Sequence, residues 1–451
     1  MKPLQVSLDL MIRSLLDAKK YSSLRDMLVI MNPADIASLF QELPDDSLPL
    51  LFRLLPKELA ADTFVEMDEE AQELLIQGFS DRELKEVLDE LYVDDAVDLV
   101  EEMPASVVKR ILRQTAPEMR KMINEILKYP EDSAGSMMTT EYVSLHPEMN
   151  VSQALARIRR TGVDRETIYN CYVITPDRRL CGIVSARSLL LSSETALIED
   201  IMESHVISVD TMTDQEEVAL MFNKYNFLAL PVVDQETRLV GIVTVDDAMD
   251  VLQEETTEDM EKMAAIVPSE RPYLKTGIFA TYRQRILWLL VLMISATASG
   301  MIITAFEDAL AAQVVLTAFI PMLMSTGGNS GSQASVTIIR GLSLNEIQYK
   351  DFLRVFWKEI RVGVLCGVTL AAANYVKLLL IDRVSSPVAA TVCLTLVLTV
   401  VFSKIVGSLL PMGAKKIGLD PAVMASPFIS TIVDILSLLI YFQIAALLLG
   451  L

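Results

Sequence analysis

The last apolar stretch of this chain contains a single charged residue, Asp434. The stretch, from Pro421 to Leu451, is longer than the roughly 20 residues that a helix needs to cross the hydrocarbon core of a bilayer. An ionised side chain near the middle of such a helix costs roughly 2.5–3.5 kcal/mol on insertion scales, so it usually faces a bundle interior or a water path. We therefore predict that Asp434 marks a route for positive charge. The alternative is a packing role, in which Asp434 hydrogen-bonds a neighbouring helix with Ser430, Thr431 and Ser437 nearby.

Charge divides the chain into two unlike parts. Residues 277–451 carry 12 Lys and Arg against 8 Asp and Glu, which leaves 27 basic and 52 acidic residues for the first 276. This acidic part is long enough for two soluble domains, and its charge argues against nucleic-acid binding and for cations as partners. The apolar remainder belongs in a lipid bilayer.

The residue types that enzymes use are scarce. Only His146 and His205 are available as histidine bases, and the four cysteines are too scattered for a zinc site or a disulfide framework. No nucleophile–base constellation is recognisable, so we do not expect an enzyme. We also expect no cleavable signal peptide, because charges are scattered through the N-terminal segment.

Five apolar segments in the second part are predicted to span the membrane. They are residues 286–306, 311–339, 360–380, 388–410 and 422–449. Lys and Arg are concentrated before the first segment, between the second and third, and between the fourth and fifth. By the positive-inside rule, we expect a cytoplasmic N-terminal part and an external C-terminus. The clear charge at mid-span is negative, which disfavours an anion channel.

The first of two internal repeats lies between Pro33 and Pro130. Apolar residues at helical spacing recur there with a period of about 24 residues, punctuated by Pro56, Ser80 and Pro104. We predict an all-α helical-repeat domain whose units bury their faces on one another.

The second repeat covers residues 136–253. Each copy is predicted to form a short strand, a helix, two strands flanking a turn and a closing helix, and the GIVS of 182–185 aligns with the GIVT of 241–244. The segment resembles a tandem cystathionine-β-synthase (CBS) domain pair of α+β fold. The Gly-apolar-apolar-Ser/Thr-x-x-Asp signature is complete in the second copy, whereas Ser188 takes the acidic position of the first.

Such pairs often bind adenine nucleotides, so the resemblance implies a cleft for ATP. The residues that it implies are Tyr169, Asn170, Ser185, Arg187, Phe227, Leu228, Thr244 and Asp247. Core packing explains Phe227 and Leu228 equally well, and Ser188 departs from the nucleotide-binding pattern.

Acidic side chains crowd the segment that joins the CBS pair to the first apolar segment. They recur three or four residues apart from Asp246 to Glu261 and therefore share faces of a helix. Like charges at this spacing destabilise a helix unless cations neutralise them, and carboxylate oxygens are the ligands that Mg²⁺ prefers. With further clusters upstream, the pattern predicts divalent-cation sites; a solvated charged face is the alternative. The candidate ligands are Asp94, Asp98, Glu216, Asp247, Asp250, Glu255, Glu258 and Asp259.

The second apolar segment is interrupted by Pro321 and by the small and polar residues STGGNSGSQ of 325–333. Close helix packing explains Gly327 and Gly331, which have GxxxG spacing. It does not explain Asn329 and Gln333, which are costly against lipid but useful to a hydrated ion.

The order of these features resembles the MgtE family of magnesium channels over nearly the whole chain. STGGNSGSQ, the DPAVMASPFISTIVD of 420–434 and the acidic connector resemble its signatures. The resemblance implies a multidomain membrane protein with a helical-repeat N domain (1–130), a CBS pair (131–253), an acidic connecting helix (254–276) and a five-span α-helical membrane domain (277–451). It also implies a homodimer with its pore on the two-fold axis and Asp434 as the pore carboxylate. The other candidate pore-lining residues are Asn329, Gln333, Ser426, Ser430 and Asp420.

We therefore expect a passive Mg²⁺ channel of the cell membrane. The resemblance implies that its acidic cytosolic surfaces bind Mg²⁺ and close the pore when cytosolic Mg²⁺ is high. Mg²⁺ gives up its water shell reluctantly, so two Asp434 side chains of a symmetric dimer are expected to hold it through water. The main alternative is a CBS-regulated, ion-coupled carrier for divalent cations, although five spans do not divide into an inverted repeat. A CBS-regulated anion channel and a non-transporting membrane sensor are the others.

Overall fold

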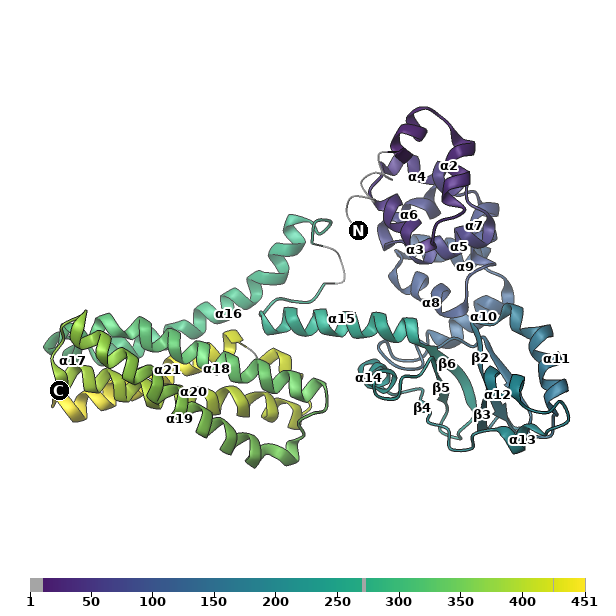
Figure 1. Cartoon of the computed structure of the whole chain (residues 1–451). Coiled ribbons are helices and arrows are strands. Elements are labelled where there is room, and N and C mark those ends of the chain that lie inside the picture. Colours follow the sequence, from purple (N-terminus) through teal and green to yellow (C-terminus); the bar gives the residue numbers. More distant parts are fainter. Residues whose placement is uncertain (1–10, 270–272, 425, 451) are drawn as a thin grey trace. The chain divides into compact units, whose positions relative to one another are not determined.

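The computed structural model describes residues 11–269, 273–424 and 426–450. The chain forms two compact units, residues 1–252 and 253–451, and each is described by itself. The first contains short helices followed by two small sheets, and the second contains long helices (Figure 1). This division agrees with the change in charge and hydropathy along the sequence.

The N-terminal domain of the first unit is all helical. Odd-numbered helices contact one another in sequence, α3 with α5, α5 with α7 and α7 with α9, while α4 contacts α6. Each helix buries an apolar stripe, which in α7 is Leu84, Val87 and Leu88. The expected helical repeat is confirmed. Its helices are α2 (Tyr21–Leu28), α3 (Pro33–Gln41), α4 (Leu48–Phe52), α5 (Lys57–Val65), α6 (Glu69–Gly78), α7 (Asp81–Leu88), α8 (Val93–Glu102), α9 (Ala105–Gln114) and α10 (Pro117–Ile126).

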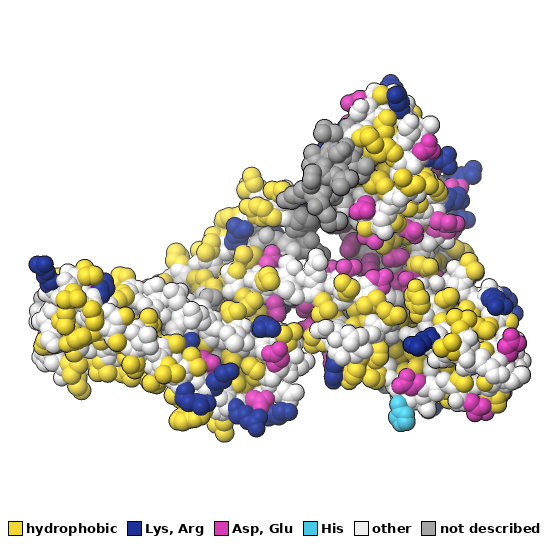
Figure 2. Space-filling model, in the orientation of Figure 1, with side chains coloured by type: hydrophobic (Ala, Val, Ile, Leu, Met, Phe, Trp, Pro, Cys, Tyr) yellow, Lys and Arg dark blue, Asp and Glu magenta, His cyan; other side chains and the backbone are white. Residues whose placement is uncertain are grey.

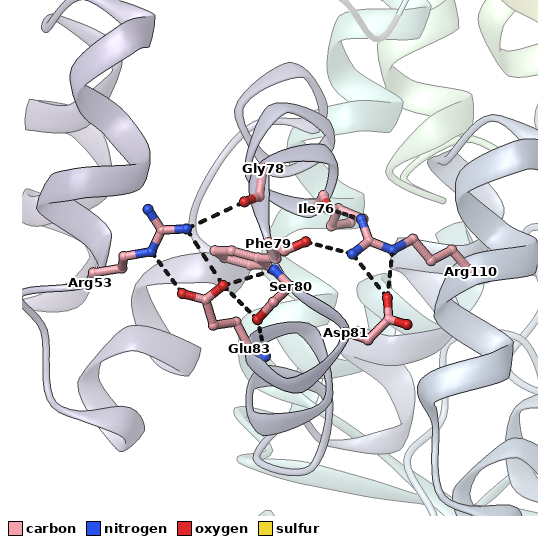
Figure 3. A network of polar contacts seen from close by, with 8 residues as sticks. All are labelled: Arg53, Ile76, Gly78, Phe79, Ser80, Asp81, Glu83 and Arg110. Atoms are coloured by element: carbon pink, nitrogen blue, oxygen red, sulfur yellow. Dashed lines mark hydrogen bonds and ion pairs between the residues drawn. The ribbon is translucent and has the colours of Figure 1, made fainter.

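Two arginines fix the joint between α6 and α7 (Figure 3). Arg53 Nε donates to Glu83 Oε1 at 2.7 Å, and Glu83 completes a capping box with Ser80 at the start of α7. Arg110, from α9, donates to the carbonyl oxygens of Ile76 and Phe79 at the end of α6. Helix ends leave carbonyl and N–H groups without partners inside the helix, so these bonds satisfy groups that the sharp turn exposes.

The CBS pair has the predicted order in both copies. The first copy is β1 (Tyr142–Leu145), α11 (Val151–Thr161), β2 (Thr167–Ile174), β3 (Leu180–Ser185) and α12 (Ala186–Leu191). The second is β4 (Val209–Asp210), α14 (Gln215–Tyr225), β5 (Ala229–Val233), β6 (Leu239–Thr244) and α15 (Val245–Met263), and α13 (Ile198–Ile201) precedes it. In each three-stranded sheet the first strand is parallel to the second, and the second is antiparallel to the third. The expected α+β repeat is confirmed.

The connecting helix differs from the prediction at both ends. We expected it over residues 254–276, but α15 begins at Val245 and ends at Met263. Ala265 has a left-handed backbone with φ 54°, and Pro268 disfavours a helical conformation of the residue before it. The chain therefore leaves the helix before the first membrane segment, and residues 270–272 lie outside the described residues.

Four helices of the described part are long and apolar enough to cross a membrane: α16 (Ile278–Ala305), α19 (Phe352–Leu380) with the preceding turn, α20 (Ser386–Lys416) and α21 (Ser426–Leu449) with the preceding turn. The expected second span, 311–339, is wrong in its extent. The structure breaks it into α17 (Glu307–Ala312), a 3-10 turn at Val314–Phe319 and α18 (Ile320–Ser343). Pro321 explains the break, because proline suits the first turn of a helix but not its interior.

Helix α18 is less apolar than the other four but is long enough to span. Its 24 residues correspond to about 36 Å at a rise of about 1.5 Å per residue. It packs against both α20 and α21, and its glycines permit these contacts. A Cβ at Gly407 would overlap the backbone of Gly331, and one at Gly327 would lie 2.8 Å from Thr399 Cγ2. Small residues let helix backbones approach closely in a membrane, which explains the GxxxG spacing.

Replacing Ser80 with alanine should loosen α7. The change removes the hydroxyl that accepts the Glu83 backbone N–H at 3.2 Å. Losing such a cap costs about 1 kcal/mol, so the amides of α7 should exchange with solvent about fivefold faster in the full-length protein. Ser38→Ala, at an exposed position within α3, is the control and should leave the exchange of α3 within twofold. Unchanged exchange in the Ser80 variant would contradict this account of the joint.

Candidate cation sites and nucleotide cleft

Asp434 lies in α21 and is half-buried within its own chain. In the described part of the structure it makes no hydrogen bond or ion pair. The nearby hydroxyls are used within α21: Thr431 donates to the Pro427 carbonyl at 3.1 Å, and Ser437 donates to the Val433 carbonyl at 2.6 Å. The packing explanation therefore gains no support from the bonds among the described residues.

Helix α18 runs beside Asp434. A Cβ added at Gly327 would lie 2.9 Å from Val433 Cγ1, and one added at Gly328 would lie 3.3 Å from Ser430 Oγ. A Cβ at Gly327 would also lie 2.9 Å from Ser437 Oγ, so α18 contacts α21 both before and after Asp434. Asn329 and Gln333, also on α18, are exposed in the single chain, so α20 and α21 leave these amide side chains uncovered.

Of two other candidate pore residues, one precedes α21 and one begins it. Asp420 belongs to the segment before the 3-10 turn Pro421–Met424, and its Oδ2 forms an ion pair with Lys262 at 2.7 Å. Ser426 is the first residue of α21, and its side chain lies outside the described residues.

A buried basic residue inside one of the spans was not predicted. Lys404 lies within α20 and is 5% exposed. The spans therefore carry a positive charge as well as the negative charge of Asp434. The position of Lys404 inside the predicted 388–410 segment was visible in the sequence. Among the described residues, it makes no hydrogen bond or ion pair.

The first unit contains a cluster of carboxylates where α8 meets the start of α15. Asp94, Asp95 and Asp98 lie on α8, and Asp247 lies in the first turn of α15. Figure 2 shows acidic side chains gathered between the helical domain and the CBS pair. Burial, and then the charge of Asp247, raises the pKa of Asp94 well above its usual value.

The other members of the cluster show the same effect. Burial and the neighbouring carboxylates raise the pKa of Asp95 to about 7 and that of Asp98 to about 8. Burial raises the pKa of Asp247 to about 6, although Thr244 donates a hydrogen bond to it at 2.6 Å. The groups that shift these pKa values include no basic residue of the described part. Desolvated carboxylates without cations resist ionisation, so these oxygens favour a proton or a metal ion.

Glu141 and Glu166, which come from the first CBS copy, were not predicted as ligands. Burial and the charge of Asp95 raise the pKa of Glu166 to about 8, and its Oε2 has no hydrogen-bond partner among the described residues. Glu141 accepts the Val93 backbone N–H at the start of α8 at 3.1 Å. Neither glutamate belongs to a run of acidic residues at helical spacing, and only the folding of the CBS sheet brings them to α8.

The predicted ligands lie in several places, as the separate acidic clusters of the sequence suggested. Asp250 has its pKa raised by burial and then by Asp246, and Glu216 lies in the first turn of a different helix, α14. Glu255, Glu258 and Asp259 lie further along α15, in the second unit. Burial, and then the charge of Asp420, raises the pKa of Asp259. In the part of the chain that the structure describes, no three carboxylate, His or Cys side chains form a ready-made metal-ligand group.

The candidate nucleotide residues lie at equivalent places in the two CBS copies. Asn170 pairs with Ser185 across β2 and β3, and Leu228 accepts the Val245 N–H next to Thr244. Thr244 donates to Asp247 in the second copy, and in the first the Ser185 and Ser188 hydroxyls are 2.9 Å apart. Ser188 thus makes the bond that Asp247 makes in the other copy, but without the charge.

The exposure of the candidate nucleotide residues differs. Tyr169, Arg187 and Leu228 are exposed, as a ligand-binding surface requires, whereas Phe227 is partly buried against the core. Asp247 belongs both to the candidate nucleotide residues and to the carboxylate cluster.

These features define a membrane-embedded protein with a large acidic part built from a helical repeat and a CBS pair. Family models match the chain in three regions: a divalent cation transporter domain at 320–444, an MgtE intracellular N domain at 31–132, and CBS domains at 134–194 and 198–254. A magnesium transporter MgtE of Thermus thermophilus is 36% identical over 95% of both chains. One of Bacillus subtilis is 34% identical over 94% of both. The chain therefore belongs to the MgtE family.

Solved structures agree with this assignment for the soluble part. A crystal structure of the cytosolic domain of the Mg²⁺ channel MgtE in complex with ATP has a TM-score of 0.52 and 36% identity, and covers 54% of this chain and 99% of that one. A crystal structure of the soluble part of a magnesium transporter has a TM-score of 0.52 and 30% identity, with coverage of 56% and 99%. The relatives are named as transporters, which confirms that this family is not one of enzymes.

The carboxylate cluster should lose stability as the pH rises. The folded pKa values of Asp98 and Glu166 exceed the usual carboxylate values, so the folded state binds more protons than the unfolded state between about pH 4 and 8. Without divalent cations, α8 should be less protected from hydrogen exchange at pH 8.5 than at pH 6, after correction for the intrinsic exchange rate. Added Mg²⁺ should remove most of the difference. Equal corrected protection at both pH values would show that ionisation of these carboxylates does not destabilise α8.

Proposed function

We propose that the protein is a Mg²⁺-selective channel that imports Mg²⁺ across the cell membrane. The observation that carries the proposal is Asp434, a half-buried carboxylate in a membrane helix with no hydrogen bond or ion pair among the described residues. A carboxylate at membrane depth is costly unless a cation or water compensates it. A passing cation supplies that compensation, and the relatives are named magnesium transporters.

The proposed channel is a homodimer with two Asp434 carboxylates beside the two-fold axis. Asn329 and Gln333 support this arrangement, because they are exposed polar residues on a helix next to α21. In lipid they would lack partners, whereas a second copy or a water-filled path would supply them. Two carboxylates match the charge of Mg²⁺, and amide side chains can hold an ion that keeps its water shell.

Regulation by cytosolic Mg²⁺ is the second part of the proposal. The cluster of Asp94, Asp95, Asp98, Glu166 and Asp247 gathers negative charge in a half-buried place, and its raised pKa values reflect the cost. Mg²⁺ bound there favours the compact arrangement over one in which α8 leaves the CBS pair. If the compact arrangement belongs to the closed channel, Mg²⁺ closes the pore by binding that state more tightly.

The proposed orientation places the soluble part and the Lys/Arg-rich loops in the cytosol and the C-terminus outside. The CBS pair is proposed to bind ATP through Asn170, Ser185, Arg187 and Thr244. This is supported by the equivalent positions of these residues in the two copies and by the ATP complex of the similar cytosolic domain. Single-channel recording distinguishes the channel from the alternative, an ion-coupled carrier, because a carrier with alternating access gives no single-channel currents.

Asp434→Asn should reduce Mg²⁺ flux into proteoliposomes to below about a tenth of the parent rate. The amide keeps the shape of the side chain but removes the charge, and a tenfold loss corresponds to about 1.4 kcal/mol. Asp308→Asn, in α17, removes a carboxylate outside the candidate pore and should leave the flux near that of the parent. Near-normal flux in the Asp434 variant, at equal amounts of incorporated protein, would contradict the proposal and favour a packing role for Asp434.

The pair Asp98→Asn and Glu166→Gln should raise the cytosolic Mg²⁺ concentration that half-closes the channel by about tenfold. Two of the five carboxylates are lost, so the compact state binds Mg²⁺ less well relative to the open state. Glu148→Gln, an exposed position in the same CBS copy, is the matched control. Open probability in excised patches measures the shift. Closure of the double variant over the parent's concentration range would place the sensor elsewhere.

A further inference from the structure

A lysine side chain lies between carboxylates at the end of α15. Lys262 Nζ lies 2.7 Å from Glu258 Oε1 and 2.7 Å from Asp420 Oδ2. The Lys262 side chain is 23% exposed, so solvent only partly screens these two ion pairs. Asp420 is held in place by its other oxygen, which accepts the Ala422 N–H at 2.8 Å.

The surroundings of Lys262 connect α15 to the helices of the candidate pore. Met263 packs against the buried side chains of Ile339, in α18, and Ala422, just before α21. Asp259 Oδ2 accepts a hydrogen bond from Ser343 Oγ, at the end of α18, at 3.2 Å. All these residues belong to the second compact unit. The last turns of α15 therefore contact α18 and the segment that leads into α21.

We propose that the Lys262 ammonium is a built-in competitor of the divalent cation: it bridges Glu258 and Asp420 while no metal ion is bound there, and it thereby sets the Mg²⁺ concentration at which this end of α15 binds a metal ion. This inference rests on the proposed function, in which cytosolic Mg²⁺ closes the channel, and on the prediction from the sequence that Glu258 is a Mg²⁺ ligand. It adds a residue that determines affinity without being a metal ligand itself.

The competition follows from charge and geometry. An ammonium within hydrogen-bonding distance of both carboxylates repels a second cation at the same oxygens. The described residues also contain no ready-made group of three metal ligands, so a metal ion must rearrange side chains here in order to bind. Releasing Glu258 and Asp420 from Lys262 is the rearrangement that the ion pairs define. A divalent ion brings twice the charge of the ammonium and so can replace it as the bridge.

Removing the ammonium should have two opposite effects. Without Mg²⁺, the end of α15 loses a bridge to Asp420 and should be held less firmly. With Mg²⁺, the carboxylates no longer have a tethered competitor and should bind the ion more tightly. A lysine that served only to attach α15 would give the first effect but not the second. The second effect therefore separates the proposal from a structural role.

The test uses the full-length protein in nanodiscs, with hydrogen exchange of residues 255–263 followed during Mg²⁺ titration at constant ionic strength. The half-point is the Mg²⁺ concentration that gives half of the full change in exchange. In Lys262→Met, which keeps most of the aliphatic stem, this concentration should fall at least fivefold, while exchange without Mg²⁺ becomes faster. Lys262→Arg retains the charge, so its Mg²⁺ half-point should lie within about twofold of that of the parent. Lys358→Met, which removes an exposed lysine of α19, should match the parent.

A half-point that is unchanged or higher in Lys262→Met would overturn the proposal, as would an equal fall in Lys262→Arg. The same variants should shift channel closure in patches to lower Mg²⁺ by a similar factor. A parent that is not closed by Mg²⁺ would refute the proposed function, but the hydrogen-exchange titration would still decide the role of Lys262.

Discussion

Carboxylates held away from water without basic partners are the constraint on which this account depends. In the soluble unit, five of them approach one another between α8 and the CBS pair, and their pKa values rise. In the membrane unit, Asp434 stands alone on α21. Both arrangements are costly for the chain by itself, and both become favourable when cations are supplied. A protein that carries a divalent cation and responds to it accounts for both.

The membrane unit shows how such charges can be linked to the pore. Small residues bring α18, α20 and α21 into close contact, so α18 cannot shift without moving its neighbours. The end of α15 contacts α18 through Ser343 and Ile339, and contacts the segment before α21 through Asp420. A change in how α15 is held would therefore act on the two helices that carry Asn329, Gln333 and Asp434. Lys262 stands at this point of contact.

Periodicity and local motifs predicted the architecture well. The helical repeat and the two CBS copies were recognisable because each has a strong signal of spacing in the sequence, and the single carboxylate of the last span needed no structure to be noticed. Helix ends were harder. The closing helix of the second CBS copy and the connecting helix were predicted as separate pieces, but the structure joins them in α15. The break before α18 follows from Pro321, which the prediction placed inside a span.

The cation sites could be predicted only in part. Asp94, Asp98 and Asp247 were found because acidic residues repeat near them at helical spacing. Glu166 and Glu141 were not, because neither belongs to a run of acidic residues at helical spacing and each reaches α8 only through the pairing of β1 and β2. The ion pairs of Lys262 were likewise hidden, since Asp420 lies far from it along the chain.

The central claim is that specific binding of a divalent cation, and not general screening, controls the channel. Its most direct test is the open probability of the unmodified protein in excised patches, with cytosolic Mg²⁺ varied at constant ionic strength. The account predicts that millimolar Mg²⁺ closes the channel, whereas Na⁺ of equal ionic strength leaves it open. Equal closure by both salts, or no closure by either, would contradict it.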